Sequence, residues 1–168
     1  ISATGTIEPE DLVDVGAQVA GQIISFGKDK NGRIIDYGSV VEEGTILAQI
    51  DDSLYAADVA LASAQLQQAE ASVKRAEADL VQLKARFSQA ERDWKRAQKL
   101  ASFEKALSEA DYDAYQSAYD TTHANLAVGE AAITEARASA AQAQAALQRA
   151  ERNLSYCTIR SPVRGVII

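Results

Sequence analysis

The sequence is poor in the residues from which covalent and catalytic sites are built. It has one cysteine, one histidine, two prolines and no methionine, and aromatic residues make up only 6% of its 168 residues. A single thiol, Cys157, excludes an intrachain disulfide framework and a cysteine-rich metal site. No nucleophile, base and oxyanion donor fall into a catalytic arrangement, and the lone His123 has no obvious partner. We therefore expect no enzymatic activity, no metal and no cofactor.

Positive charge and long apolar runs are also scarce. The formal net charge of −7 argues against a nucleic-acid partner, which requires a basic face to displace counterions from phosphates. No stretch approaches the roughly 18 consecutive apolar residues of a membrane-spanning helix. Because the chain opens at Ile1 without a methionine and stops within an apolar run at Ile168, we expect a fragment whose targeting segment or membrane anchor lies outside it.

Glycine and proline divide the chain into a helical middle and two flanks. Residues 45–161 contain no proline and one glycine, Gly129, so long helices are permitted there. Residues 13–23 and 46–50 alternate between apolar and other side chains, which is the period of a strand. An Asn-Gly pair within residues 29–32 predicts a tight turn between residues 23–26 and 33–37.

In the middle of the chain the apolar residues recur every seven positions, with a small or apolar residue three positions after each. This spacing predicts two helical arms that form a coiled coil. The seam residues of the first arm are Val59, Leu66, Val73, Leu80, Phe87 and Trp94, and those of the second arm are Tyr112, Tyr119, Leu126, Ile133, Ala140, Leu147 and Leu154.

The two arms are expected at about residues 53–100 and 108–156, joined by a tip at residues 101–107. Ser108 begins a sequence that can cap the second helix. An antiparallel hairpin then pairs large seam residues in one register, from Trp94 with Tyr112 to Val59 with Leu147. Residues 84–99 are mainly basic and residues 104–120 mainly acidic, so the arms should attract each other near the turn.

Gly129 lies at a seam position, opposite Ala76 and Glu77 in that register. A glycine inside a helix costs roughly 0.5–1 kcal/mol relative to alanine, so its presence calls for a reason. It lets the arms approach closely, acts as a hinge where the second arm bends, or has arisen by drift without a structural role. Between the first two we favour the hinge.

The arms are almost uncharged over residues 56–69 and 138–148, which contain a single charge, Asp58. An exposed hairpin normally carries mixed charge on its outer faces. We therefore expect this half of the hairpin to pack against neighbouring copies of the chain, and the charged half near the tip to be more solvated.

The two flanks repeat one pattern, Val-x-Gly-x-Ile-Ile, within residues 17–24 and 161–168. Three stretches, residues 13–21, 40–51 and 153–165, stand in order around a long alanine-rich hairpin, and this combination resembles the periplasmic adaptor proteins of Gram-negative efflux pumps. These are also called membrane fusion proteins of the HlyD family. The first and last stretches are most similar to the macrolide-exporter adaptors that serve ABC transporters.

The resemblance implies an α+β fold, in which a long antiparallel α-helical coiled-coil hairpin is inserted between the two halves of a lipoyl-like (biotinyl-like) β-domain. Residues 1–52 would be the first half with a preceding strand, residues 53–156 the hairpin, and residues 157–168 the start of the second half. It also implies a non-enzymatic, homo-oligomeric adaptor in the periplasm, anchored to the inner membrane. Its partners would be an inner-membrane transporter, of ABC type in preference to RND type, and a TolC-like outer-membrane channel in multidrug export.

In that family the hairpin tip carries an arginine, a leucine four residues later and a serine seven residues beyond, which contact the channel or a facing tip. Arg96, Leu100 and Ser108 fit this pattern, except that Leu100 and Ser108 are eight residues apart. Each also has a purely structural interpretation: Ser108 as a helix cap, Leu100 as a residue that closes the seam, and Arg96 as the partner of an acidic residue opposite.

Three alternatives remain open from the sequence. One is an adaptor of a type I protein secretion system, and another is an extracytoplasmic coiled-coil scaffold. The third is a lipoyl or biotinyl carrier domain, which needs a lysine that can be modified in the turn between its halves. Lys30 is the candidate, but the helical hairpin occupies that place, and we interpret Lys30 as a solvated loop residue.

Overall fold

The computed structural model describes residues 11–30, 32–103 and 108–168. Its elements in chain order are β1 (Ile23–Phe26), β2 (Val40–Val41), β3 (Ile46–Ile50), α1 (Ser53–Phe103), α2 (Glu109–Ser155), β4 (Thr158–Arg160) and β5 (Gly165–Val166). The chain divides into two compact units. We call Ile1–Val59 with Arg149–Ile168 the strand unit, and Ala60–Gln148 the helical unit.

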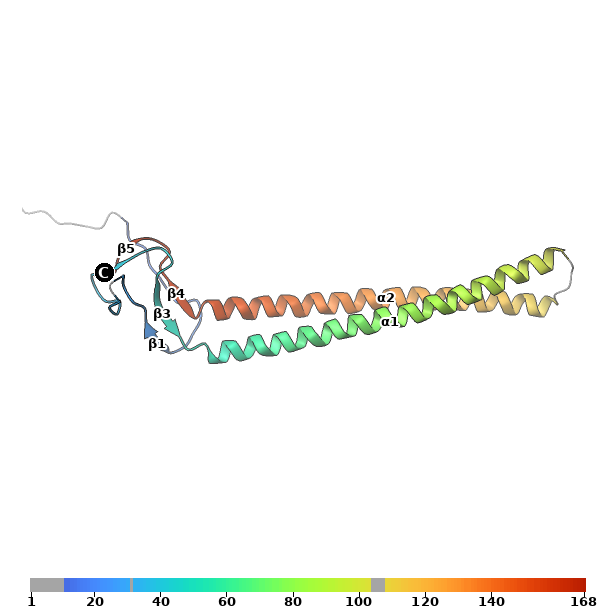
Figure 1. Ribbon diagram of the computed structural model, residues 1–168, viewed down its shortest axis with the longest axis horizontal. Helices are drawn as coiled ribbons and strands as arrows, with labels where there is room; N and C mark the ends of the chain where they lie inside the picture. Colours follow the sequence, from blue (N-terminus) through green and yellow to red (C-terminus); the bar gives the residue numbers. More distant parts are fainter. Residues whose placement is uncertain (1–10, 31, 104–107) are drawn as a thin grey trace, which may run out of the picture. The chain divides into compact units, whose positions relative to one another are not determined.

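In the strand unit, strands from before the helices pair with strands from after them. One sheet has the order β1-β3-β4 and a second joins β2 to β5, with every pair antiparallel. The central strand β3 is bonded to β4 with Gln49 opposite Thr158, and Val41 lies opposite Gly165 in the second sheet. The two flanks therefore form one β-unit, and the helices are inserted between its halves in the sequence (Figure 1).

A small core lies where β3 meets the return from α2. Ile50 and Cys157 are 2% and 1% exposed, and Val41 and Ala48 are also buried. The Ile50 amide donates a hydrogen bond of 2.8 Å to the carbonyl of Cys157. Burial raises the pKa of the Cys157 thiol. The interpretation of Cys157 as a small buried residue is confirmed.

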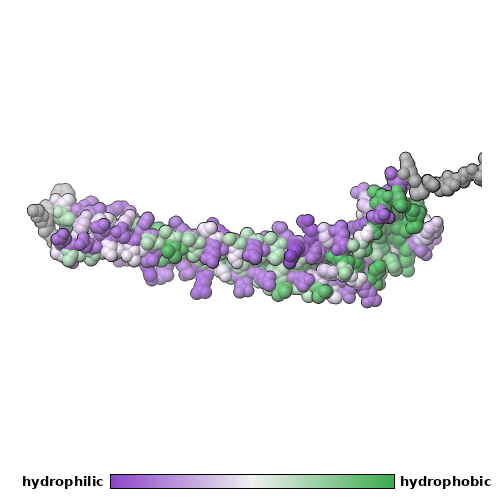
Figure 2. Space-filling view, turned by 180° about the vertical axis from the view of Figure 1, so that it is seen from behind, coloured by the Kyte–Doolittle hydropathy of each residue, from purple (hydrophilic) through white to green (hydrophobic). Residues whose placement is uncertain are grey.

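Much of the apolar surface of the strand unit stays exposed. Hydrophobic residues cover part of this unit in Figure 2. Ile24, Phe26, Ile34 and Tyr37 are among those that remain more than half accessible. The unit buries few large side chains.

The prediction of a strand over residues 13–23 is wrong for most of that range, because strand structure begins only at Ile23. Val13 and Val15 are 48% and 42% exposed. Alternation of apolar residues suits a strand, but a strand also needs a neighbour that completes its hydrogen-bond ladder. Within the described residues, β1 pairs with β3, and residues 13–22 pair with none of the five strands.

The turn predicted within residues 29–32 is present in the part that the structure describes. The Gly32 amide donates to the carbonyl of Asp29 at 3.0 Å, and Gly32 has a φ of 78°, which favours glycine. The Asp29 amide donates to the carbonyl of Arg33, and Lys28 forms a bridge with Ile34. Asn31, part of the predicted pair, lies outside the described residues.

The helical unit contains most of α1 and α2, which lie side by side and antiparallel (Figure 1). Every predicted seam residue is buried or half-buried. The rings of Trp94 and Tyr112 have centroids 4.8 Å apart, and those of Phe87 and Tyr119 are 5.5 Å apart. Both predicted aromatic contacts across the seam are thereby confirmed.

Gly129 does not lie where the single register placed it. It is buried, and a Cβ added to it would lie 2.6 Å from Leu83 Cδ1 and 3.2 Å from Leu80 Cδ1, so it faces these leucines rather than Ala76 and Glu77. Helices pack by inserting a large residue of one into a space left by small residues of the other. Leu80 and Leu83 pack over Gly129, where the absence of a side chain leaves space for them.

This contact supports close approach as the reason for Gly129. We predict that Gly129→Ala lowers the free energy of unfolding by about 1 kcal/mol. An added methyl in a packed seam costs roughly 1–3 kcal/mol, and the better helix propensity of alanine offsets about 0.5–1 kcal/mol of it. Denaturant unfolding of the full chain, followed by circular dichroism, measures the difference.

The matched control is the same change in a Leu83→Ala background, where the methyl no longer meets Leu83 Cδ1. There Gly129→Ala should be neutral or stabilising, so the two changes should be strongly non-additive. A clear gain of stability in the parental chain would instead support the hinge interpretation.

Candidate functional site

The candidate site is the end of the hairpin, where α1 finishes at Phe103 and α2 begins at Glu109. Of the expected tip, residues 104–107 lie outside the described residues. Arg96 and Leu100 lie one helical turn apart near the end of α1, and both are exposed, Leu100 by 44%. They therefore offer a cationic and an apolar side chain on one face.

Ser108 is the N-cap of α2. Its hydroxyl accepts a hydrogen bond of 3.1 Å from the Asp111 amide and donates one of 2.6 Å to Asp111 Oδ2. This arrangement satisfies an amide of the first turn that has no partner within the helix. The predicted cap is confirmed, and Glu109 and Asp111 add negative charge where the helix dipole favours it.

Arg96 pairs with an acidic residue of its own helix, and not with one on the opposite arm as its structural interpretation from the sequence had it. The guanidinium of Arg96 binds the carboxylate of Asp93, and Lys95 Nζ lies 2.6 Å from Glu91 Oε1. Pairs three or four residues apart form readily on a helix, because their side chains already share a face. In residues 84–99, all of which are described, the ion pairs are within α1, so the expected attraction between the arms near the turn is not seen there.

Among residues 11–30, 32–103 and 108–168, one ion pair joins the arms, and it lies farther from the tip. Arg137 Nη2 donates a hydrogen bond of 2.9 Å to Glu77 Oε1, and these side chains are 65% and 47% exposed. Sequence reasoning missed this pair, although the heptad spacing places both residues beside the seam.

The sequence also showed no sign that His123 takes part in packing. Its ring lies 5.6 Å from that of Phe87, and it is stacked on Tyr119 with an interplanar angle of 18° and a centroid distance of 6.2 Å. His123 therefore extends the aromatic contact between Phe87 and Tyr119. It is a packing residue on the edge of the seam.

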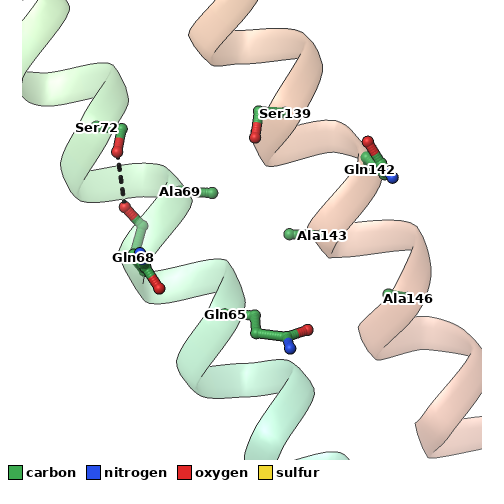
Figure 3. Close-up of a pocket in the computed structure, with 8 residues that line it drawn as sticks. All are labelled: Gln65, Gln68, Ala69, Ser72, Ser139, Gln142, Ala143 and Ala146. Carbon is green, nitrogen blue, oxygen red and sulfur yellow. Dashed lines mark hydrogen bonds between the residues drawn. The ribbon is translucent and has the colours of Figure 1, made fainter.

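A groove of about 360 Å³ runs between α1 and α2 in the almost uncharged half of the helical unit. In Figure 3, Ala69 and Ala143 point toward each other across it, and the Ser72 hydroxyl bonds to the carbonyl of Gln68. The groove is lined by Gln65, Gln68, Ala69, Ser72, Ser139, Gln142, Ala143 and Ala146. No side chain of this lining carries a charge.

The loop lysine proposed for a carrier domain is held in an ion pair. Lys30 Nζ lies 2.5 Å from Glu42 Oε1. The hydrogen bond and the positive charge of Lys30 hold the pKa of the Glu42 carboxyl below its ordinary value. Lys30 is 64% exposed, so it is a surface residue with a carboxylate partner.

Among residues 11–30, 32–103 and 108–168, no group of three or more His, Cys, Asp or Glu side chains is placed to hold a metal ion. In the same residues no helix has the length and apolar character needed to span a membrane.

Comparison with known proteins gives consistent likenesses. The crystal structure of MacA from Actinobacillus actinomycetemcomitans matches with a TM-score of 0.57 and 28% identity, over 96% of this chain and 43% of MacA. The pyoverdine export membrane fusion protein PvdR from Pseudomonas aeruginosa is 41% identical over 59 residues, which are 35% of this chain and 13% of PvdR. The periplasmic adaptor protein EmrA matches with a TM-score of 0.48 and 13% identity, too distant to carry an argument. No protein family model matches the chain.

These likenesses confirm the resemblance to the periplasmic adaptors, or membrane fusion proteins. They also confirm the α+β class, with a long helical hairpin and a small antiparallel β-domain. The chain spans less than half of MacA and about an eighth of PvdR.

The cap of α2 can be tested without reference to function. We predict that Ser108→Ala lowers the free energy of unfolding by about 1 kcal/mol, because the Asp111 amide loses its acceptor. Thermal and urea unfolding of the full chain measure it. Ser117→Ala, at an exposed position inside α2, is the matched control and should change stability by less than about 0.5 kcal/mol. Equal effects of the two changes would contradict the capping role.

Proposed function

We propose that this chain is part of a periplasmic adaptor that bridges an inner-membrane transporter and an outer-membrane channel during drug efflux. The observation that carries the proposal is the likeness to MacA, which extends over 96% of the chain at 28% identity. The local match to PvdR, named as an export membrane fusion protein, points to the same class.

The geometry suits a role in assembly. Two antiparallel helices can present a tip at a distance from the membrane, and the exposed side chains of Arg96 and Leu100 leave that tip available for contact. Such a function needs positioned surfaces rather than reacting groups. We therefore propose a non-enzymatic role that requires no cofactor.

The partners follow from the proposed class. They are an inner-membrane transporter, of ABC type in preference to RND type, a TolC-like channel and further copies of the chain. The protein would act in the periplasm, anchored to the inner membrane. An adaptor for type I protein secretion is the nearest alternative, and it would show itself by the export of a protein rather than of small molecules.

The two alternatives of another class receive less support. A coiled-coil scaffold would need only the helices, but here strands from both sides of the helical insertion form common sheets. A carrier domain would need a free lysine, but Lys30 is bound to Glu42.

The adaptor proposal predicts that the tip is essential to export. In the full-length protein in its host, Arg96→Asp or Leu100→Asp should reduce efflux by about tenfold or more. Arg96→Asp reverses a charge in the proposed contact surface, and Leu100→Asp places a charge where an apolar side chain would be buried by the partner. Efflux is measured as the minimal inhibitory concentration of exported drugs.

Arg92→Asp is the matched control, since Arg92 is exposed on the same helix one turn earlier. It should leave efflux close to the parental level, and all three variants should retain parental helicity and abundance. Efflux that survives both tip changes would exclude contact through these residues.

The uncharged half of the hairpin is proposed to face neighbouring copies. In the full-length protein, Leu61→Cys and Gln68→Cys should be linked between copies by a bismaleimide, whereas Gln82→Cys and Arg86→Cys in the charged half should be linked much less. All four positions are exposed, and Cys157 is buried and should not compete. Efficient links at residues 82 and 86 without links at 61 and 68 would contradict the proposal.

A further inference from the structure

Residues 11–22 lie on the strand unit without joining either of its sheets, and we call them the strap. Residues 11–15 line a cavity of about 790 Å³, whose other walls include Val41, Leu47 and strand β5. Gly16 lines a second cavity, of about 280 Å³, together with strand β4. The strap therefore covers β4 and β5 with space beneath it.

Most of the strap is held by no hydrogen bond. Among the described residues, residues 11–19 neither donate nor accept one, and the side chains of Leu12, Val13 and Val15 are exposed. A segment with few buried contacts and few backbone hydrogen bonds opens at a small cost in free energy. Residues 11–19 are therefore the loosely held part of the strap.

The last three residues of the strap are attached to the start of α1. The Tyr55 hydroxyl donates a hydrogen bond of 2.9 Å to the carbonyl of Ala20. The Asp51 amide donates one of 2.8 Å to the carbonyl of Gln22. We call these two hydrogen bonds the clasp, and all four residues belong to the strand unit.

Gly21, between the two bonded carbonyls, lies against the core of the unit. A Cβ added to Gly21 would clash with Ile50 Cγ2, and Ile50 is among the most deeply buried residues. Because glycine has no Cβ, the backbone of the strap can approach this residue at the end of β3. The clasp therefore forms where the strap touches the core.

Asp51 connects the clasp to the beginning of α1. Its Oδ1 accepts a hydrogen bond of 3.0 Å from the Ser53 amide, one of the first amides of the helix, which have no partner within it. The hydrogen bond from Ser53 holds the pKa of the Asp51 carboxyl below its ordinary value. The same residue thus binds α1 through its side chain and the strap through its backbone.

The two bonds of the clasp differ in how they can open. Asp51 follows β3 directly, so its amide moves only with the end of that strand. The hydroxyl of Tyr55 is carried by a side chain, which can leave the carbonyl of Ala20 by rotation about its own bonds. The hydroxyl is therefore the part of the clasp that opens without a change in the backbone of the unit.

We infer that the strap is a movable cover over β4 and β5, and that the Tyr55 hydroxyl is the positioning group that keeps its attached end in place. While the clasp is closed, residues 11–19 lift from the cavities and residues 20–22 stay on Ile50. When the clasp opens, the strap detaches as far as Ile23, where β1 begins. The inference concerns the strand unit alone and does not depend on the proposed function.

Amide hydrogen exchange of the full chain, followed by NMR, tests both parts of the inference. In the parental chain, the amides of residues 11–19 should exchange within about tenfold of the rates of an unfolded peptide, and the Asp51 amide should be protected. Tyr55→Phe keeps the ring and removes the hydroxyl. The Asp51 amide should then exchange about fivefold faster, as expected for the loss of one hydrogen bond. The Ile50 amide, bonded to the carbonyl of Cys157, should keep its parental rate.

Tyr156→Phe is the matched control. Tyr156 is half-buried in the same unit and lines the smaller cavity, and among the described residues its hydroxyl makes no hydrogen bond. Removing that hydroxyl should leave the exchange rate of the Asp51 amide unchanged.

Gly21→Ala opens the clasp by a different route. The added methyl should displace residues 20–22 from Ile50, so the Asp51 amide should exchange faster by about tenfold or more. In that background Tyr55→Phe should have little further effect, because the hydroxyl has already lost its acceptor.

Three results would overturn the inference. One is protection of residues 11–19 as strong as that of β3, because the strap would then be firmly held. Another is an unchanged exchange rate of the Asp51 amide in Tyr55→Phe. The third is an equal acceleration of the Ile50 and Asp51 amides in that variant, because the hydroxyl would then stabilise the whole unit rather than the clasp.

Discussion

The structure depends on one interaction, the apolar seam between α1 and α2. Neither helix has a wide apolar face, so each can bury its narrow stripe only against the other. The seam is aromatic near the tip, where Trp94 meets Tyr112 and Phe87 meets Tyr119, and is rich in alanine farther away. Large side chains give strong local contacts at one end, and small ones allow close approach at the other.

The two flanks of the seam differ in the polar side chains that they carry. On one flank the side chains of Glu77 and Arg137 form an ion pair between the arms. The other flank contains an uncharged groove lined by glutamine, serine and alanine, which suits contact with another neutral surface.

The strand unit joins the two ends of the long helical insertion. Pairing of β3 with β4 and of β2 with β5 connects residues more than a hundred positions apart, and the buried Ile50 and Cys157 pack at this junction. In the proposed adaptor, the seam would keep the two helices together up to the tip, and the exposed Arg96 and Leu100 would contact the outer-membrane channel.

The sequence by itself determined what depends on local periodicity and local hydrogen bonding. The heptads identified the helices and their seam residues, Ser108 identified the cap of α2, and the isolated Cys157 was correctly placed in the interior. The tertiary structure decided what depends on partners distant in the sequence. Residues 13–22 have the alternation of a strand but pair with none of the strands described, Gly129 faces Leu80 and Leu83 rather than Ala76, and His123 lies on two rings. Periodicity shows which face of a helix is buried. The stagger between two helices depends on how side chains of unequal length from both helices fit together, so the sequence pattern of one helix does not determine it.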